Sequence, residues 1–269
     1  MKSIILGVLI NTATIGSAFA TCTYNLDATP IEISQLYSGQ NITEKFPTVV
    51  SQDYGYKVTS TSGVLNSLRL YAAGSSTFVQ AVSSWDASNS KEATLNGDIT
   101  LPATGIYAIE FKINSFPYSV LSGSTEYNLG AMIIGTSNNQ RGVNIIPTLS
   151  NTSTGLKLKI EIVDKLGGTY YTVSYPVPTQ LENFRYGIYF NQDSKQLGVI
   201  VNGINKGYIG SPMSNKIDAL GIILQGRNYN IPSYAAYLNK NITAKLITDK
   251  NQIIFNYPVG TKDICGNTI

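Results

Sequence analysis

Short runs in which apolar and polar residues alternate constrain the fold of this chain more than any other feature. Residues 186–210 read YGIYFNQDSKQLGVIVNGINKGYIG. Every second residue from Tyr186 to Phe190 is apolar or aromatic, which is the period of a strand with one buried face. A polar turn follows, and Asn202-Gly203 is the strongest short signal for a hairpin. The stretch therefore predicts three antiparallel strands of one sheet.

Runs of the same kind recur along the chain, between clusters of Gly, Asn, Ser and Pro. Helical periodicity is hard to find beyond the first twenty residues. The expected strands are Tyr56–Ser60, Ser67–Ala72, Ile106–Ile113, Ala131–Gly135, Val143–Pro147, Leu156–Val163, Tyr170–Tyr175, Tyr186–Phe190, Gln196–Val201, Lys206–Ile209, Ala219–Leu224 and Ile242–Ile247. So many antiparallel strands pack as two sheets or close into a barrel. We predict an all-β fold, an antiparallel two-sheet β-sandwich.

The first twenty residues have the pattern of a secretory signal. Lys2 precedes an apolar run from Ile4 to Ile10, and Ala18 and Ala20 form the small-residue cleavage pattern. Polar residues interrupt the run before it reaches the ~18 residues that a membrane-spanning helix needs. We therefore expect a signal peptide at residues 1–20 and a single mature domain at residues 21–269. This domain is expected to be exported, periplasmic or extracellular, and not inserted in a membrane.

Cys22 and Cys265 are the only two cysteines and lie at the two ends of the expected mature chain. In an oxidising compartment we expect one disulfide between them, with two free thiols as the alternative. Such a bridge brings the chain ends together. Cys22–Asp27 and Ile253–Tyr257 are then expected to be neighbouring edge strands.

Composition excludes several classes of function. Charged residues make up 13% of the chain, and the formal net charge is +3. Nucleic-acid binding needs a clustered basic surface, so this balance argues against it. The chain contains no histidine. Ser-His-Asp catalysis, Cys-His catalysis and histidine-based metal sites are therefore excluded.

Several segments together resemble a known superfamily. They are TGIYAIEFKIN, AMIIGTSN, GLKLKIEIVD, FRYGIYFNQDSKQLGVIVNGINKGYIG and DALGIILQGRN. In this order they resemble the strands of concanavalin A-like jelly rolls, which include laminin-G-like and legume-lectin-like proteins. The resemblance covers about residues 104–247 and implies a jelly-roll sandwich.

The resembling superfamily also includes glycoside hydrolases, so carboxylate pairs are of interest. Hydrolases of the laminarinase type carry E-x-D-x-x-E, which places the acid and the nucleophile on one face of a strand. This motif is absent. The nearest carboxylates are Glu110, and Glu161 with Asp164, but residues three apart on a strand point to opposite faces. We therefore predict that the protein is not an enzyme.

Saccharide sites combine aromatic faces with amide and carboxylate groups. The residues of these types near predicted loops, which we expect to bind the ligand, are Trp85, Asp86, Asn228, Tyr229 and Tyr234. The alternative is that the tyrosines pack across strands.

Calcium is a cofactor that the resemblance implies, because oxygen ligands on rim loops organise many laminin-G-like and legume-lectin-like sites. Asn191 and Asp193 in the NQDSK turn are the expected ligands. Tight turns also select Asn and Asp for their own geometry, which is the alternative explanation.

These features predict an exported, non-catalytic protein that binds a carbohydrate or a cell-surface ligand. Two alternatives stay open. One is a structural or adhesive surface component that binds protein partners, for which an exposed, unpaired sheet edge would be evidence. The other is a glycoside hydrolase.

Overall fold

In the computed structural model, residues 22–36, 43–50, 52–63, 68–88, 97–138, 140–178 and 181–269 are described. The expected signal peptide, residues 1–20, lies outside these ranges. No helix within them is long and apolar enough to cross a membrane.

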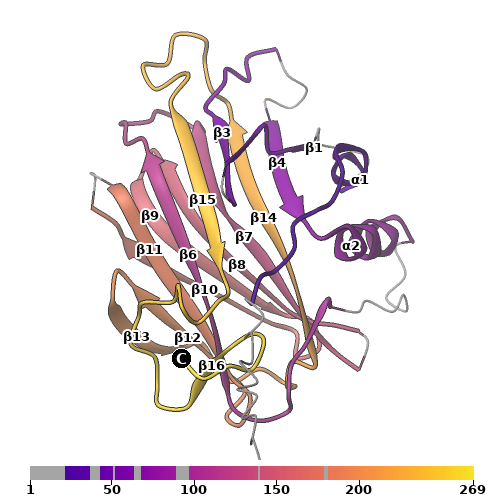
Figure 1. The fold of residues 1–269 in the computed structure, drawn as a ribbon. Coiled ribbons are helices and arrows are strands. Elements are labelled where there is room, and N and C mark those ends of the chain that lie inside the picture. Colours follow the sequence, from indigo (N-terminus) through magenta and orange to yellow (C-terminus); the bar gives the residue numbers. More distant parts are fainter. Residues whose placement is uncertain are drawn as a thin grey trace, which may run out of the picture.

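The chain folds into two eight-stranded sheets that face each other (Figure 1). Sheet A has the order β1 (Thr43–Lys45), β4 (Leu68–Gly74), β14 (Ala219–Tyr229), β7 (Glu126–Ser137), β8 (Gln140–Thr152), β9 (Gly155–Asp164) and β10 (Thr169–Pro176), with β5 (Ile99–Thr100) beside β14. Sheet B has the order β13 (Ile204–Ile209), β12 (Gln196–Val201), β11 (Leu181–Asn191), β6 (Ile106–Phe116), β15 (Asn241–Ile247), β3 (Asp53–Lys57) and β2 (Thr48–Val50), with β16 (Thr261–Asp263) beside β6. Among the strands that the structure describes, only β1–β4 and β16–β6 pair in parallel. The predicted two-sheet β-sandwich is confirmed.

The inward-facing side chains of both sheets form one large core. Tyr107, Ile109 and Phe111 on β6 are at most 1% exposed. The ring of Phe111 lies 4.9 Å from that of Tyr186 on β11. Alternation therefore places the buried face of these strands correctly, because a strand exposes successive side chains on opposite sides.

Two helices cover part of the outer face of sheet A, where the sequence predicted none. They are α1 (Pro30–Gln35) and α2 (Ser76–Ser88). Thr29 caps α1 in a reciprocal capping box with Glu32. In α2, Phe78, Val79 and Val82 pack towards the sheet. Their spacing is helical, but the β-branched and hydroxyl residues around them have weak helix propensity, which hid the signal.

The two chain ends also differ from expectation. Neither Cys22–Asp27 nor Ile253–Tyr257 forms a strand. Residues 253–257 instead cross the outer face of sheet B without regular structure, and Phe255 and Tyr257 pack there against Tyr189 and Ala108. A chain that crosses a sheet face has no neighbour at strand spacing with which to form a ladder.

Candidate functional site

The outer face of sheet A changes character along its strands. On β14 the outward positions pass from Ile223 to Gln225 and Arg227, and on β7 they pass from Met132 to Asn128. Ile223 and Met132 lie under α1 and α2. Beyond the helices the outward positions are polar and open to solvent. The helices thus cover only one end of the outer face of sheet A. The other end is a polar surface supported by the buried inner face of the same sheet.

This polar end of sheet A is hollowed, and we call it the open face. The hollow has a volume of about 440 Å³. It is lined by Leu70, Glu126, Asn128, Ile146, Thr148, Ser150, Lys159, Glu161, Gln225, Gly226 and Arg227. These residues come from β4, β14, β7, β8 and β9, so five adjacent strands build its floor.

A hydrogen-bonded cluster lies at one end of the open face, on β9 and β10. Lys159 Nζ lies 2.8 Å from Glu161 Oε1, and the hydroxyl of Tyr170 donates to the same oxygen at 2.5 Å. Thr172 Oγ1 in turn donates to the Tyr170 hydroxyl at 2.9 Å. Partial burial alone would raise the pKa of Glu161, but the hydrogen bonds from Lys159 and Tyr170 hold it below its usual value. Glu161 is therefore an ionised acceptor on an accessible surface.

A second charged pair lies on the β7 and β14 side of the hollow, and its arginine is near enough to help lower the pKa of Glu161. The Arg227 guanidinium forms an ion pair with Glu126. The same guanidinium lies 5.4 Å from the ring centre of Tyr229, a cation–π distance. Because Arg227 and Tyr229 alternate with buried residues on β14, both project from the same side of the sheet.

The predicted ligand-binding residues are not gathered in one place. Tyr229 borders the open face beside Arg227. Asn228, the next residue inward, is fully buried and donates to Thr59 Oγ1 at 3.2 Å, so its side chain faces the interior. Tyr234 is 88% exposed and lines a separate hollow of about 440 Å³ with Val120 among its other residues.

Trp85 and Asp86 were expected near a loop, but their backbone belongs to α2. Their side chains lie outside the described part of the structure. The ligand-binding roles of these residues and of Tyr229 and Tyr234 stay predictions.

The expected calcium ligands both accept backbone hydrogen bonds, Asn191 within its own turn and Asp193 from the loop before β6. Asn191 Oδ1 accepts hydrogen bonds from the backbone N–H groups of Asp193 and Ser194, at 3.0 and 3.1 Å. The Asp193 carboxylate accepts one from the N–H of Gly105 at 3.1 Å. This is the geometry of a side chain that stabilises a turn. Calcium binding stays a prediction.

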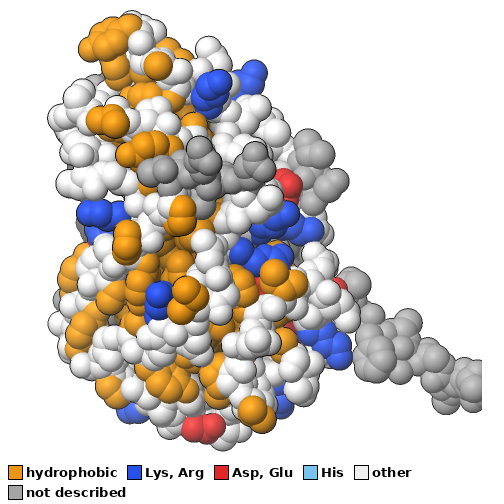
Figure 2. Space-filling model, turned by 90° about the vertical axis from the view of Figure 1, so that its left-hand side faces the viewer, with side chains coloured by type: hydrophobic (Ala, Val, Ile, Leu, Met, Phe, Trp, Pro, Cys, Tyr) orange, Lys and Arg blue, Asp and Glu red, His pale blue; other side chains and the backbone are white. Residues whose placement is uncertain are grey.

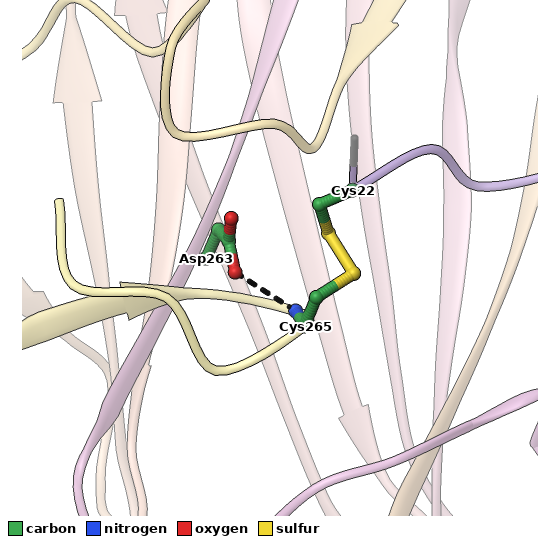
Figure 3. Close-up of side chains that lie close together, drawn as sticks. All are labelled: Cys22, Asp263 and Cys265. Carbon is green, nitrogen blue, oxygen red and sulfur yellow. Dashed lines mark hydrogen bonds between the residues drawn. A yellow bond between two sulfur atoms is a disulfide. The ribbon is translucent and has the colours of Figure 1, made fainter. Parts of the chain in front are cut away.

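Among the described residues, one group of three acidic or sulfur ligands lies close enough to hold a metal: Cys22, Asp263 and Cys265 (Figure 3). The predicted disulfide between Cys22 and Cys265 is present, with an S–S distance of 2.07 Å. The sulfurs are therefore bonded to each other. Asp263 accepts hydrogen bonds from the N–H groups of Cys265 and Asn267, at 3.0 and 2.9 Å. The group fixes the C-terminal turn and is not a metal centre.

Glu110, the other carboxylate that the sequence singled out, is fully buried on the outer side of sheet B. Its Oε2 lies 3.1 Å from Arg185 Nη1. Its Oε1 accepts hydrogen bonds from the N–H groups of Ile254 and Phe255, at 3.1 and 2.9 Å. Burial raises the pKa of Glu110 despite these partners. The C-terminal residues cover it, so it offers nothing to a ligand.

Apart from Glu161, which the sequence offered only as a candidate carboxylate, the residues that line the open face were not predicted from the sequence. A signal for them exists in Ala131–Gly135 and Ala219–Leu224, which are apolar at every position and therefore predict burial on both faces. Towards Asn128 and Arg227 these apolar runs change to an alternation of apolar and polar residues. This change marks where the helices cease to cover the outer face of sheet A.

The chain belongs to the family described as "Domain of unknown function (DUF4882)", whose model matches residues 6–267. No protein of curated function matches it in sequence. Solved structures do match in fold. One is a GlcNAcα1-4Gal-releasing endo-β-galactosidase from Clostridium perfringens, with 14% identity and a TM-score of 0.38 over 53% of this chain and 37% of that one.

Another is porphyranase B from Zobellia galactanivorans, with 7% identity and a TM-score of 0.36 over 54% of this chain and 64% of that one. A third is a legume lectin-like domain from Entamoeba histolytica, with 13% identity and a TM-score of 0.33 over 56% of this chain and 76% of that one. This chain thus spans less than two thirds of the length of the first two proteins. The expected resemblance to concanavalin A-like jelly rolls is confirmed for the fold.

These matches correct one expectation from the sequence. The protein was predicted not to be an enzyme, whereas the matched structures include an endo-β-galactosidase and a porphyranase. The absence of a laminarinase-type motif excludes only one arrangement of catalytic residues, because a single fold hosts many different sites.

Proposed function

We propose that the protein is exported and that its open face binds a carbohydrate. The observation that carries this proposal is the hollow of about 440 Å³ on the sheet, which is lined by two pairs of acidic and basic side chains and by the amides of Asn128 and Gln225. Sugars present rows of hydroxyl groups, which need donors and acceptors at fixed spacing. Glu161 with Lys159 supplies one such set, and Arg227 with Glu126 supplies the other.

Two tyrosine rings complete the proposed site, the exposed Tyr170 and the partly buried Tyr229. Tyr170 is 59% exposed beside Glu161, and Tyr229 lies beside Arg227. Tyrosine offers an apolar face to sugar C–H groups and a hydroxyl to their oxygens. Tyr170 on β10 and Tyr229 on β14 are separated by strands β7, β8 and β9, so the face between them suits several sugar units of a chain better than a single monosaccharide.

The cations of the open face are already paired with carboxylates, which bears on the kind of sugar. Lys159 pairs with Glu161, and Arg227 pairs with Glu126. A polymer with one acidic group per unit would find these positive charges largely offset. We therefore infer that the preferred ligand is a neutral glycan.

Cleavage of the bound glycan is a second candidate function, which the matched enzymes favour. A Glu126–Glu161 pair would not serve, because Glu161 is level with Ile146 on β8 while Tyr127, next to Glu126, is level with Asn151. At ~3.3 Å per residue the backbones of Glu126 and Glu161 are offset by about 20 Å along the strands, and the Arg227 guanidinium lies between the two carboxylates as the partner of one and a neighbour of the other. Two-carboxylate hydrolysis needs roughly 5–9.5 Å. Proton transfer on this face would instead use Glu161 with its hydrogen-bonded neighbour Tyr170.

The test is binding of the oxidised mature chain to a broad glycan panel, with calcium present and with calcium chelated. Lys159→Gln and Glu161→Gln should each weaken binding by about tenfold, because each removes a charged hydrogen-bonding group. Lys57→Gln is the matched control, since Lys57 is exposed on β3 of the other sheet. Shortened products that Glu161→Gln abolishes would establish cleavage. Absence of binding to every glycan, or binding that neither variant changes, would overturn the proposal.

A further inference from the structure

The two sheets end in four edge strands, β1 and β10 in sheet A and β13 and β2 in sheet B. An unpaired edge presents free N–H and C=O groups that can recruit another chain, and proteins protect edges by shortness, charge or irregularity. β1 and β2 have three residues each, and β1 carries Glu44 and Lys45. β13 carries Lys206 and a shift of register against β12. Each of these three edges is protected.

The fourth edge, β10, is neither short, charged nor irregular, and its one protective feature is Pro176 at its last position. Its sequence is TYYTVSYP, eight residues without a charge or a glycine. All eight residues pair in regular register with β9. On its other side β10 has no strand partner in the part of the chain that the structure describes. The strand is therefore a long, regular and uncharged edge, rich in the aromatic and β-branched residues that favour strand pairing.

One face of β10 packs against the core through Tyr171, Val173 and Tyr175. Tyr171 and Tyr175 project towards sheet B, where the Tyr171 hydroxyl meets Ser211 at 2.5 Å and Lys206 Nζ lies 5.8 Å from the Tyr175 ring. Figure 2 views the molecule from the side on which β9, β11 and β13 lie in Figure 1. Hydrophobic side chains form a band down this side, with basic side chains beside it and few acidic ones.

We propose that β10 is a docking edge for a second copy of this chain, whose own β10 pairs with it antiparallel. The sequence of the strand is complementary to itself in this arrangement. With Val173 opposite its counterpart, Tyr171 lies opposite Tyr175 and Thr172 lies opposite Ser174. Aromatic pairs and hydroxyl pairs directly across an antiparallel ladder are favourable, and no like charges meet. An unrelated partner would have to match this pattern by chance.

Pairing of this kind joins the two copies of sheet A into one continuous sheet. In an antiparallel ladder, directly opposite residues point to the same side, so the two open faces lie on one surface of the dimer. One long glycan could then contact both faces, and its second contact would be intramolecular. This consequence rests on the proposed function, whereas the docking of β10 does not.

The experiment is sedimentation of the oxidised mature chain over a wide range of concentration, together with Thr172→Pro and Val173→Pro. Successive N–H groups of a strand point to opposite sides, so one of these prolines removes a bond to β9 and the other removes an outward N–H. The wild type should dimerise. The proline variant that keeps its melting temperature lacks the outward N–H. Because the dimer is two-fold symmetric, this substitution removes one intermolecular hydrogen bond in each copy, so the dimer dissociation constant should rise by about tenfold or more.

Two further variants keep the test decisive if the prolines impair folding. Ser174→Lys changes an exposed side chain of β10 and places two positive charges near the two-fold axis, so it should also weaken the dimer. Ile204→Lys makes the same change on β13, where Ile204 is 61% exposed, and should leave the dimer intact. A wild type that is monomeric at every concentration would overturn the proposal. A dimer lost through Ile204→Lys but not through Ser174→Lys would overturn it too.

Discussion

Glu110 and Glu161 occupy similar positions in the two sheets and have opposite fates. Each lies on the outer side of its sheet and pairs with one cation, Arg185 or Lys159. The Glu110 side chain is fully buried, whereas that of Glu161 is 27% exposed. The C-terminal residues cover the first, and solvent covers the second. A charged residue on the outer side of a strand is thus buried or accessible according to whether another segment covers it. The alternation of the strand does not encode that cover.

Of the changes that test this difference between Glu110 and Glu161, removal of Arg185 should lower the free energy of unfolding the most. Arg185→Ala leaves Glu110 buried without a cation, and breaking a buried pair in this way costs about 3–5 kcal/mol. The free energy of unfolding from denaturant titration measures the loss. Lys159→Ala, the matched change in sheet A, should cost less than about 1 kcal/mol because its pair is exposed.

The double variant Arg185→Ala with Glu110→Gln tests the cause. It should recover part of the lost stability, since an uncharged amide can still accept the N–H groups of Ile254 and Phe255. Equal losses for Arg185→Ala and Lys159→Ala would show that the two pairs do not differ in role.

The disulfide should contribute the next largest effect, because it anchors the segment that covers Glu110. Cys22→Ser with Cys265→Ser should lower the free energy of unfolding by about 2–4 kcal/mol. Amide hydrogen exchange can locate the loss. Exchange at Ile254 and Phe255 should accelerate more than exchange at Ile160 of β9. Equal acceleration at both places would mean that the bridge stabilises the whole fold and not the covering segment in particular.

The sequence predicted the inner faces of both sheets, because burial on one side imposes a period of two. Phe111 and Tyr186 are examples, since alternation alone assigns each of them to a core face. The disulfide was predictable too, since a chain with two cysteines has one way to pair them within itself. The predicted strands were often too short at one end. β7 begins at Glu126, five residues before the apolar run that revealed it, and these extra residues carry part of the open face.

The exposure of the outer faces was not predictable, because it depends on segments far away in the sequence that cover one part of a sheet and not another. Nothing in IYAIEFKIN shows that Glu110 will meet Ile254, which lies 144 residues later. In GLKLKIEIVD the same alternation yields an accessible Glu161. Residues of the site are therefore found only by asking which outward positions lack a cover, and that question requires the fold.

The smallest expected effect is also the sharpest, because the two carboxylates should change stability with pH in opposite directions. Burial raises the pKa of Glu110 above its usual value of 4.5. Its contribution to stability is therefore complete below about pH 4.5 and is lost as the pH rises through its value in the folded state. The pKa of Glu161 is lowered from 4.5. Its contribution is present above about pH 4.5 and is lost as the pH falls through its folded value.

The measurement is the free energy of unfolding against pH for the wild type, Glu110→Gln and Glu161→Gln. As the pH rises from about 4.5, the free energy of unfolding of the wild type should fall relative to that of Glu110→Gln, because only the glutamate must ionise in a buried site. As the pH falls below about 4.5, the free energy of unfolding of the wild type should fall relative to that of Glu161→Gln. Two curves of the same sign would mean that Arg185 and the two N–H donors outweigh the burial of Glu110. The contrast between a structural and an accessible carboxylate would then rest on exposure alone.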